Sequence, residues 1–112
     1  MINGLDVLKS LRVLMLGKNK LKKIENLSTL RKLDVLDLHN NQITKIENLE
    51  QLVDLRVLNL AGNQIKRVEN LRSLQSLTEL NLRRNLIESV VSVAIFNGHN
   101  LSEIISLSVE GL

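Results

Sequence analysis

The fold of this chain is decided by residues 30–51, which read LRKLDVLDLHNNQITKIENLEQ, because the same 22-residue pattern recurs on both sides of them. The pattern fits residues 8–29, 52–73 and 74–95 in one frame, and residues 1–7 match the end of a further, partial repeat. A fixed period of this length predicts a solenoid in which each repeat stacks on the next. We therefore expect residues 1–112 to form a single repeat domain.

Each repeat contains the segment LxxLxLxxN, which predicts one short strand. Its Leu-x-Leu pair alternates with a period of two, so Leu36 and Leu38 should point into the core. The rest of the repeat has apolar residues at spacings of two, three and three, which favours a 3₁₀ or irregular return because 22 residues leave no room for several α-helical turns. These features predict a right-handed solenoid of the α/β class, with parallel strands on the concave face and the returns on the convex face.

An asparagine closes the LxxLxLxxN segment of every full repeat. We expect each of these amides to turn inward and to bond main-chain groups of its own and the neighbouring turn, since a buried loop backbone requires partners. We interpret this asparagine ladder as structural; its members are Asn19, Asn41, Asn63 and Asn85.

The pattern breaks near the end of the chain, and two interpretations of residues 96–112 remain open. If five residues are inserted relative to the 22-residue period, the pattern of leucines resumes. The tail would then be a partial fifth repeat, with an enlarged loop at residues 96–100 and a strand over residues 105–109. Alternatively, this divergent tail is unrelated to the repeats and forms a helix or remains disordered. The chain also opens in mid-pattern, which suggests a fragment or a shortened isoform.

The composition narrows the functional classes. Among 112 residues, 44% are hydrophobic, one is aromatic and none is cysteine or proline. The lack of cysteine excludes a disulfide framework, a thiol nucleophile and thiolate metal ligands, and favours a cytoplasmic location. No apolar run approaches the roughly 18 residues that a membrane span needs, so we expect no membrane association.

Catalysis and nucleic-acid binding find no support in the sequence. His39 and His99 have no second ligand at a metal-binding spacing, and no phosphate loop, nucleophile elbow or carboxylate pair is recognisable. We therefore predict no enzyme activity, metal or cofactor. Nearly absent aromatic side chains leave no stacking platform for bases.

The outward strand positions form the candidate partner surface, because the concave face is where a solenoid usually binds. Three valines on adjacent strands suit a pleated surface and would also make an apolar contact stripe, and both interpretations remain open. The candidate partner-binding residues are Val13, Met15, Val35, Asp37, His39, Val57, Asn59, Glu79, Asn81 and Arg83.

The returns carry two parallel columns of charge. The basic column is Lys23, Lys45 and Arg67, and the acidic column, two positions further on, is Glu25, Glu47 and Glu69. Opposite columns side by side favour a solvated face linked by ion pairs. The alternative is that the basic residues steer an acidic protein partner towards the solenoid.

Residues 41–49, NQITKIENL, and the near copies at residues 19–27 and 63–71 resemble the SDS22-like class of leucine-rich repeats. Three runs, at residues 4–14, 33–49 and 76–85, are more narrowly similar to the leucine-rich repeat subunits of tubulin polyglutamylase complexes. That resemblance implies a non-catalytic adaptor near microtubules, at the cytoskeleton, the centriolar satellites or the cilium. Its protein partners would be polyglutamylase subunits or microtubule-associated proteins.

Other functions fit the same repeats. A phosphatase-regulatory module of the SDS22 type and a dynein-assembly factor are the alternatives within the repeat class. A further alternative is a truncated isoform with no independent partner, whose uncapped ends would promote self-association.

Overall fold

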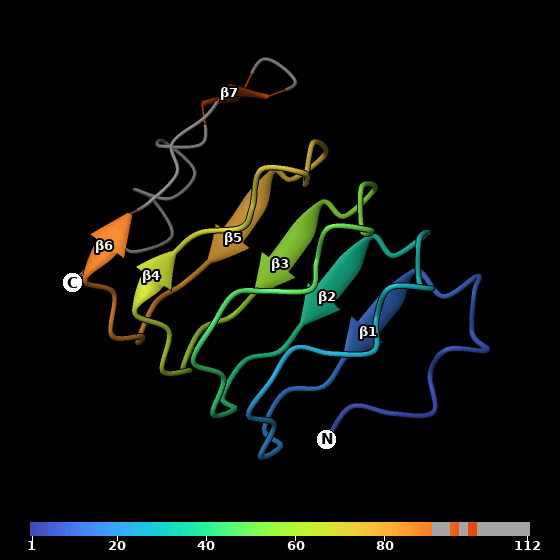
Figure 1. Cartoon of the computed structure of the whole chain (residues 1–112), viewed down its shortest axis with the longest axis horizontal. Coiled ribbons are helices and arrows are strands. Elements are labelled where there is room, and N and C mark those ends of the chain that lie inside the picture. Colours follow the sequence, from blue (N-terminus) through green and yellow to red (C-terminus); the bar gives the residue numbers. More distant parts are fainter. Residues whose placement is uncertain (91–94, 97–98, 101–112) are drawn as a thin grey trace.

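The computed structural model describes residues 1–90, 95–96 and 99–100, and these carry all structural statements below. Four short strands lie side by side in one parallel sheet, in the order β1-β2-β3-β5 (Figure 1). They are β1 (Val13–Met15), β2 (Val35–Asp37), β3 (Val57–Asn59) and β5 (Glu79–Asn81). Each residue pairs with the one 22 positions later, as in Leu36 with Leu58. The predicted solenoid of short parallel strands is therefore confirmed, and the sequence period is the register of its sheet.

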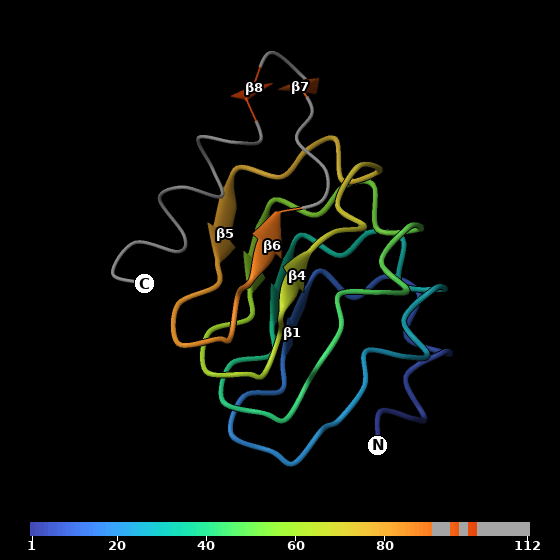
Figure 2. The same cartoon turned by 60° about the vertical axis from the view of Figure 1, so that its left-hand side comes forward.

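The returns between these strands are irregular and extended. No helix of any kind occurs in the described part of the chain, so the irregular return is confirmed and the 3₁₀ alternative is wrong there. Two short strands, β4 (Arg67–Val68) and β6 (Ser89–Val90), pair in parallel in a second layer (Figure 2). The sequence analysis did not predict them. They form because stacked, extended returns bring main-chain donors and acceptors of successive turns into register.

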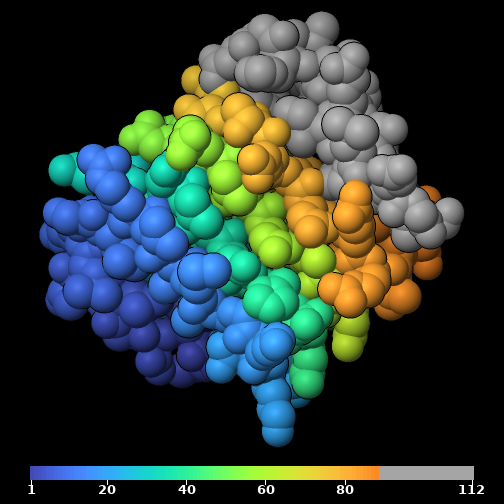
Figure 3. Space-filling view, turned by 180° about the vertical axis from the view of Figure 1, so that it is seen from behind, coloured from blue at the N-terminus to red at the C-terminus, as the bar shows by residue number. Residues whose placement is uncertain are grey.

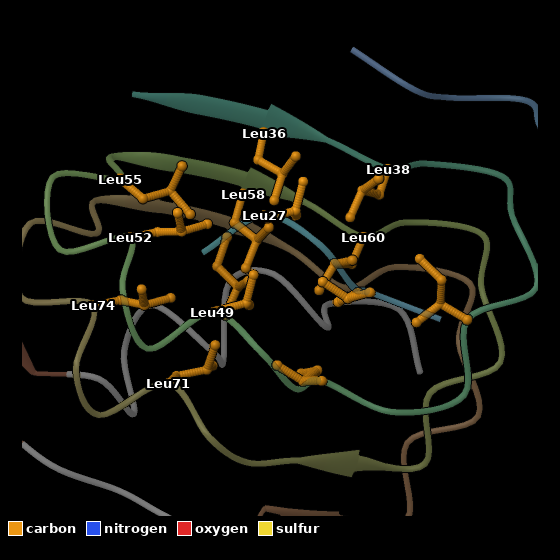
Figure 4. Close-up of a cluster of buried hydrophobic side chains, with 14 of the residues drawn as sticks. Leu27, Leu36, Leu38, Leu49, Leu52, Leu55, Leu58, Leu60, Leu71 and Leu74 are labelled. Atoms are coloured by element: carbon orange, nitrogen blue, oxygen red, sulfur yellow. The ribbon is translucent and has the colours of Figure 1, made fainter. Parts of the chain in front are cut away.

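The core lies between the four-stranded sheet and the returns, and it is aliphatic throughout. Figure 4 shows leucines from the strands, such as Leu36 and Leu58, facing leucines from the returns, such as Leu49 and Leu71. The side chains of Leu36, Leu58 and Leu49 are completely buried. Successive turns appear as adjacent bands in the space-filling view (Figure 3), so each turn covers the apolar layer of the one before. Burial of such side chains is worth about 2 kcal/mol each, which explains why stacking holds the array together.

At the end of the fourth repeat the structure describes two further short strands. Strands β7 (Ile95–Phe96) and β8 (His99–Asn100) pair antiparallel, where the sequence analysis expected an enlarged loop. The predicted strand over residues 105–109, and the alternative of an unrelated tail, fall outside the described residues. The described residues also contain no helix that is long and apolar enough to cross a membrane.

Candidate interaction surface

The outer face of the four-stranded sheet carries the predicted partner-binding residues. Register aligns Val13, Val35, Val57 and Glu79 in one column across the strands. Val13 is 50% exposed, whereas Val35 and Val57 are half-buried and Glu79 is exposed. The inner valines thus pack against their neighbours, yet the column remains open to solvent along its length. Both interpretations of the valines, as packing and as contact residues, are compatible with this geometry.

The next column, Met15, Asp37, Asn59 and Asn81, has a structural role in three of its four members. Asp37 Oδ1 accepts a hydrogen bond from the main-chain N–H of His39 at 3.0 Å, Asn59 Oδ1 from Ala61 at 3.0 Å, and Asn81 Oδ1 from Arg83 at 3.1 Å. Each is an Asx turn, in which the side chain caps the main chain two residues later. Met15 cannot form this turn and is 67% exposed. A partner contacting this column would meet preorganised polar side chains on β2, β3 and β5 and an apolar one on β1.

His39 is held on this face by the carboxylate of Asp37, which also accepts a hydrogen bond from Asn59. Its Nδ1 lies 2.6 Å from Asp37 Oδ1, and Asn59 Nδ2 lies 3.5 Å from the other oxygen of the same carboxylate. The imidazole also covers Gly17 of the preceding turn, where any added Cβ would overlap the ring. The contacts connect three adjacent turns and orient the imidazole of His39 on the sheet face.

An ion pair that the sequence analysis did not predict lies at the entry to the strands. Arg56 donates from Nε to Asp34 Oδ1 at 2.5 Å and from Nη2 to Asp34 Oδ2 at 2.9 Å. This fork keeps the pKa of Asp34 below its ordinary value, chiefly through the hydrogen bond, and raises that of Arg56. The signal was present in the sequence as opposite charges 22 residues apart, one period of the sheet.

The asparagine ladder is confirmed for Asn41, Asn63 and Asn85, all of which are buried. Asn41 shows the pattern: its Nδ2 donates to Leu38 O at 3.0 Å in its own turn and to Leu16 O at 3.1 Å in the preceding one. Its Oδ1 accepts the N–H of Leu21 at 3.1 Å. Asn19 differs because, among the described residues, it belongs to the outermost strand-bearing turn. It is exposed, and its amide donates only within its own turn.

A second asparagine ladder, which the sequence analysis did not predict, runs along the returns. Asn26, Asn48 and Asn70 have positive φ angles of 60°, 62° and 61°. Each side-chain amide donates to a carbonyl 24 residues earlier, Asn48 Nδ2 to Ile24 O at 2.7 Å for example. Asparagine tolerates this left-handed conformation better than most residues. The invariant asparagine in the IENL and VENL segments was the signal that could have revealed it.

The two charge columns of the returns do not form the predicted ion pairs. The basic column is exposed and the acidic column is half-buried. Between pairs of described residues, the contacts of opposite charge type within 4.0 Å are the Asp34–Arg56 ion pair and the Asp37–His39 hydrogen bond, neither of which involves these columns. The expectation of a face linked by ion pairs is therefore wrong for the described part of the chain.

The acidic and histidine side chains offer no metal-binding group in the described residues, where no three of them come close enough to hold an ion. The arrangement suits contact with another macromolecule: a sheet face with an apolar column, fixed polar groups and exposed charges at its margins.

Comparison with known proteins identifies the class. The family model for leucine-rich repeats (2 copies) matches residues 9–51 and again residues 53–94. The chain therefore belongs to the leucine-rich repeat family, whose members are generally non-catalytic interaction modules. No curated protein matches the chain significantly in sequence.

Solved structures with the same fold include proteins from bacteria and from an insect. Internalin C2 of Listeria monocytogenes is 34% identical, with a TM-score of 0.71, and the match covers 75% of this chain and 37% of that one. Internalin InlF of the same organism is 28% identical, with a TM-score of 0.65 over 81% of this chain and 31% of that one. A chain of the Drosophila melanogaster SNF/U2A′ complex is 29% identical, with a TM-score of 0.61, and the match covers 78% of this chain and 53% of that one. The chain thus spans about a third to a half of these structures.

Proposed function

We propose that this chain is a non-catalytic protein-interaction scaffold that binds its partner on the outer face of the four-stranded sheet. The observation that carries the proposal is the valine column Val13, Val35 and Val57. It is set in register by the strands, and part of it remains exposed. An apolar column framed by fixed polar groups matches the anatomy of a protein interface. The similar chain in the SNF/U2A′ complex supports a role within a protein assembly.

The assembly that we propose is a tubulin-modifying complex. The support is the resemblance of residues 4–14, 33–49 and 76–85 to leucine-rich repeat-containing protein 49, a non-catalytic subunit of the tubulin polyglutamylase complex. In this proposal the chain helps to position the enzyme that adds glutamates to tubulin tails. Its location would be cytoplasmic, at the cytoskeleton, the centriolar satellites or the cilium.

Affinity purification from ciliated cells tests the proposal. The tagged chain should co-purify with polyglutamylase subunits, as identified by mass spectrometry. Changing Val13, Val35 and Val57 together to Glu should abolish this recovery, because three carboxylates would have to be desolvated at the interface. The matched control changes Thr29, Gln51 and Ser73 to Glu, which adds the same charge to one column of the returns.

The outcomes separate the levels of the proposal. The natural chain could recover phosphatase or dynein-assembly proteins instead of polyglutamylase subunits, with only the valine variant losing them. That result would support the interaction scaffold and would contradict the tubulin-modifying complex. Equal recovery by the valine variant and the control would remove the sheet face as the binding surface.

A further inference from the structure

Three residues after the end of each strand of the four-stranded sheet, the backbone adopts a positive φ angle. The residues at this position are Lys18, Asn40, Gly62 and Arg84, with φ angles of 58°, 53°, 70° and 57°. The N–H groups of the first three each donate to the carbonyl oxygen 21 residues later, at 2.8 to 2.9 Å. The left-handed conformation therefore belongs to the way in which successive turns stack.

The four side chains differ in how well they suit this conformation. Glycine and asparagine adopt it at little cost, whereas lysine and arginine do so rarely, because their Cβ crowds the backbone. Lys18 and Arg84 thus occupy a position at which the chain itself uses Asn40 and Gly62. Residues in an unfavourable backbone conformation are concentrated at functional sites. A binding role of the two cationic side chains would account for their presence here.

The loops that contain these residues are basic throughout. They comprise residues 17–20, 39–42, 61–64 and 83–86, here named the loop ridge, and follow the arrowhead ends of the strands (Figure 1). The ridge has four cationic residues and no acidic one, a charge of +4, against +3 for the whole chain. Lys18, Lys20 and Arg84 are exposed, and no described carboxylate lies within 4.0 Å of their charged groups. Their charge is therefore open to a ligand.

The cations of the ridge form two separate groups. Lys18 and Lys20 lie in the first loop and Arg83 and Arg84 in the fourth, while the two loops between them carry no lysine or arginine. Neighbouring strands lie about 4.8 Å apart, so three steps place the two groups about 14 Å from each other. An extended chain covers that distance in about four residues. The ridge therefore fits a segment that has two acidic pairs four residues apart.

We propose that the loop ridge binds an extended acidic segment of a partner protein. One acidic pair of the segment faces Lys18 and Lys20, and the other faces Arg84. Charge complementarity of this kind speeds association and selects the partner. The valine column of the sheet face is not part of this site, so the two proposals can fail separately.

The distribution of charge favours a protein segment over a nucleic acid. A phosphate backbone carries one charge at every nucleotide, whereas the middle of the ridge has no lysine or arginine. The ridge also contains no Phe, Tyr or Trp on which bases could stack.

The binding test uses the full chain and the capped peptide Glu-Glu-Ser-Ser-Glu-Glu in an NMR titration at low salt. The amide signals of residues 17–20 and 83–86 should shift, and affinity should fall as salt is added. The capped peptide Glu-Glu-Glu-Glu-Ser-Ser has the same charge but cannot reach both groups of cations. It should bind at least about threefold more weakly.

Variants separate binding from stability. Changing Lys18 and Arg84 together to Asn should weaken binding of the first peptide at least about fivefold, because two charge contacts are lost. The same change should raise the midpoint of thermal unfolding by about 3–5 °C, since asparagine suits the left-handed conformation. The matched control changes Lys45 and Lys66 to Asn. Both are exposed and lack a positive φ, so this variant should alter affinity less than about twofold and the midpoint by less than about 2 °C.

Four results would overturn the proposal. Absence of binding at low salt would remove the site. Equal losses of affinity in the two variants, or equal affinity for the two peptides, would reduce the contact to general attraction. A lower unfolding midpoint after the change of Lys18 and Arg84 would assign these residues to stability. Tighter binding of a thymidine pentanucleotide, which carries the same four negative charges as the peptide, would replace the protein segment by a nucleic acid.

Discussion

Asn63 donates a hydrogen bond from Nδ2 to the carbonyl oxygen of Leu38, 3.0 Å away and 25 residues earlier in the chain. The same amide donates to Leu60 O at 3.0 Å in its own turn, and Oδ1 accepts from Ile43 N–H at 3.0 Å. One side chain thus replaces the main-chain partners that two successive turns lack. Stacking of two turns is therefore what gives these buried main-chain groups their hydrogen-bond partners, and a single turn would lack them.

The first prediction concerns this residue. Asn63→Ala should lower the free energy of unfolding by about 3 kcal/mol, because buried main-chain groups of two turns lose their partner. Urea unfolding followed by circular dichroism measures the change. Asn19→Ala is the matched control and should cost under about 1 kcal/mol, since Asn19 is exposed and bonds only its own turn. Equal costs at the two positions would show that the bonds between turns add nothing.

The second prediction separates conformation from hydrogen bonding in the ladder of the returns. Asn48 has a φ of 62° and donates to Ile24 O. Asn48→Gly keeps the left-handed conformation and should cost about 1 kcal/mol for the lost bond. Asn48→Ala should cost about 1–2 kcal/mol more, because alanine is strained at this φ. Thermal or urea unfolding of the two variants gives the comparison, and identical stabilities would exclude backbone strain as a cause.

The third prediction compares equivalent leucines in an inner and an outer turn. Leu58 is completely buried between turns, whereas Leu14 of the outermost strand is 8% exposed and is covered by a strand on one side only. Leu58→Ala should destabilise by about 3–4 kcal/mol through a closed cavity, and Leu14→Ala by at least about 1 kcal/mol less. Urea unfolding of both variants tests this. A larger loss at Leu14 would indicate that the β1 edge is covered in solution.

The fourth prediction concerns the pH dependence of the Asp34–Arg56 pair. The pKa of Asp34 is lowered in the folded chain, so its ionised form stabilises the fold above the ordinary pKa of an aspartate. That stabilisation is lost as the pH falls through the lowered pKa. An NMR titration of the Asp34 carboxyl carbon should give a midpoint below that of an unfolded peptide. Arg56→Gln should move the midpoint upwards.

A matched pair of variants links that titration to stability. Asp34→Asn should remove part of the acid dependence of unfolding, while Asp54→Asn, an exposed aspartate outside the ion pairs of the described residues, should leave it unchanged. An unchanged acid dependence in both variants would show that the exposed pair is screened by solvent.

Much of the candidate surface was predictable, because register in a parallel sheet follows directly from a constant period. The columns beginning at Val13 and Met15 were predicted from spacing alone and are aligned in the structure. What spacing could not reveal is that Asp37, Asn59 and Asn81 are already occupied by Asx turns. Which side chain forms a hydrogen bond with which main-chain atom depends on local geometry. One sequence is compatible with several such pairings.

The sequence by itself determined the family, the strand positions, the aliphatic core and the first asparagine ladder, because a 22-residue repeat restricts the chain to stacking like residues on like. Only the tertiary structure decided that the returns pair as strands at β4 and β6, that a second ladder is formed by asparagines such as Asn48, and that Asp34 binds Arg56. The physical reason is that periodicity fixes which residues are neighbours. Which main-chain groups find a hydrogen-bond partner, and which side chains stay exposed, depends on how closely successive turns approach one another.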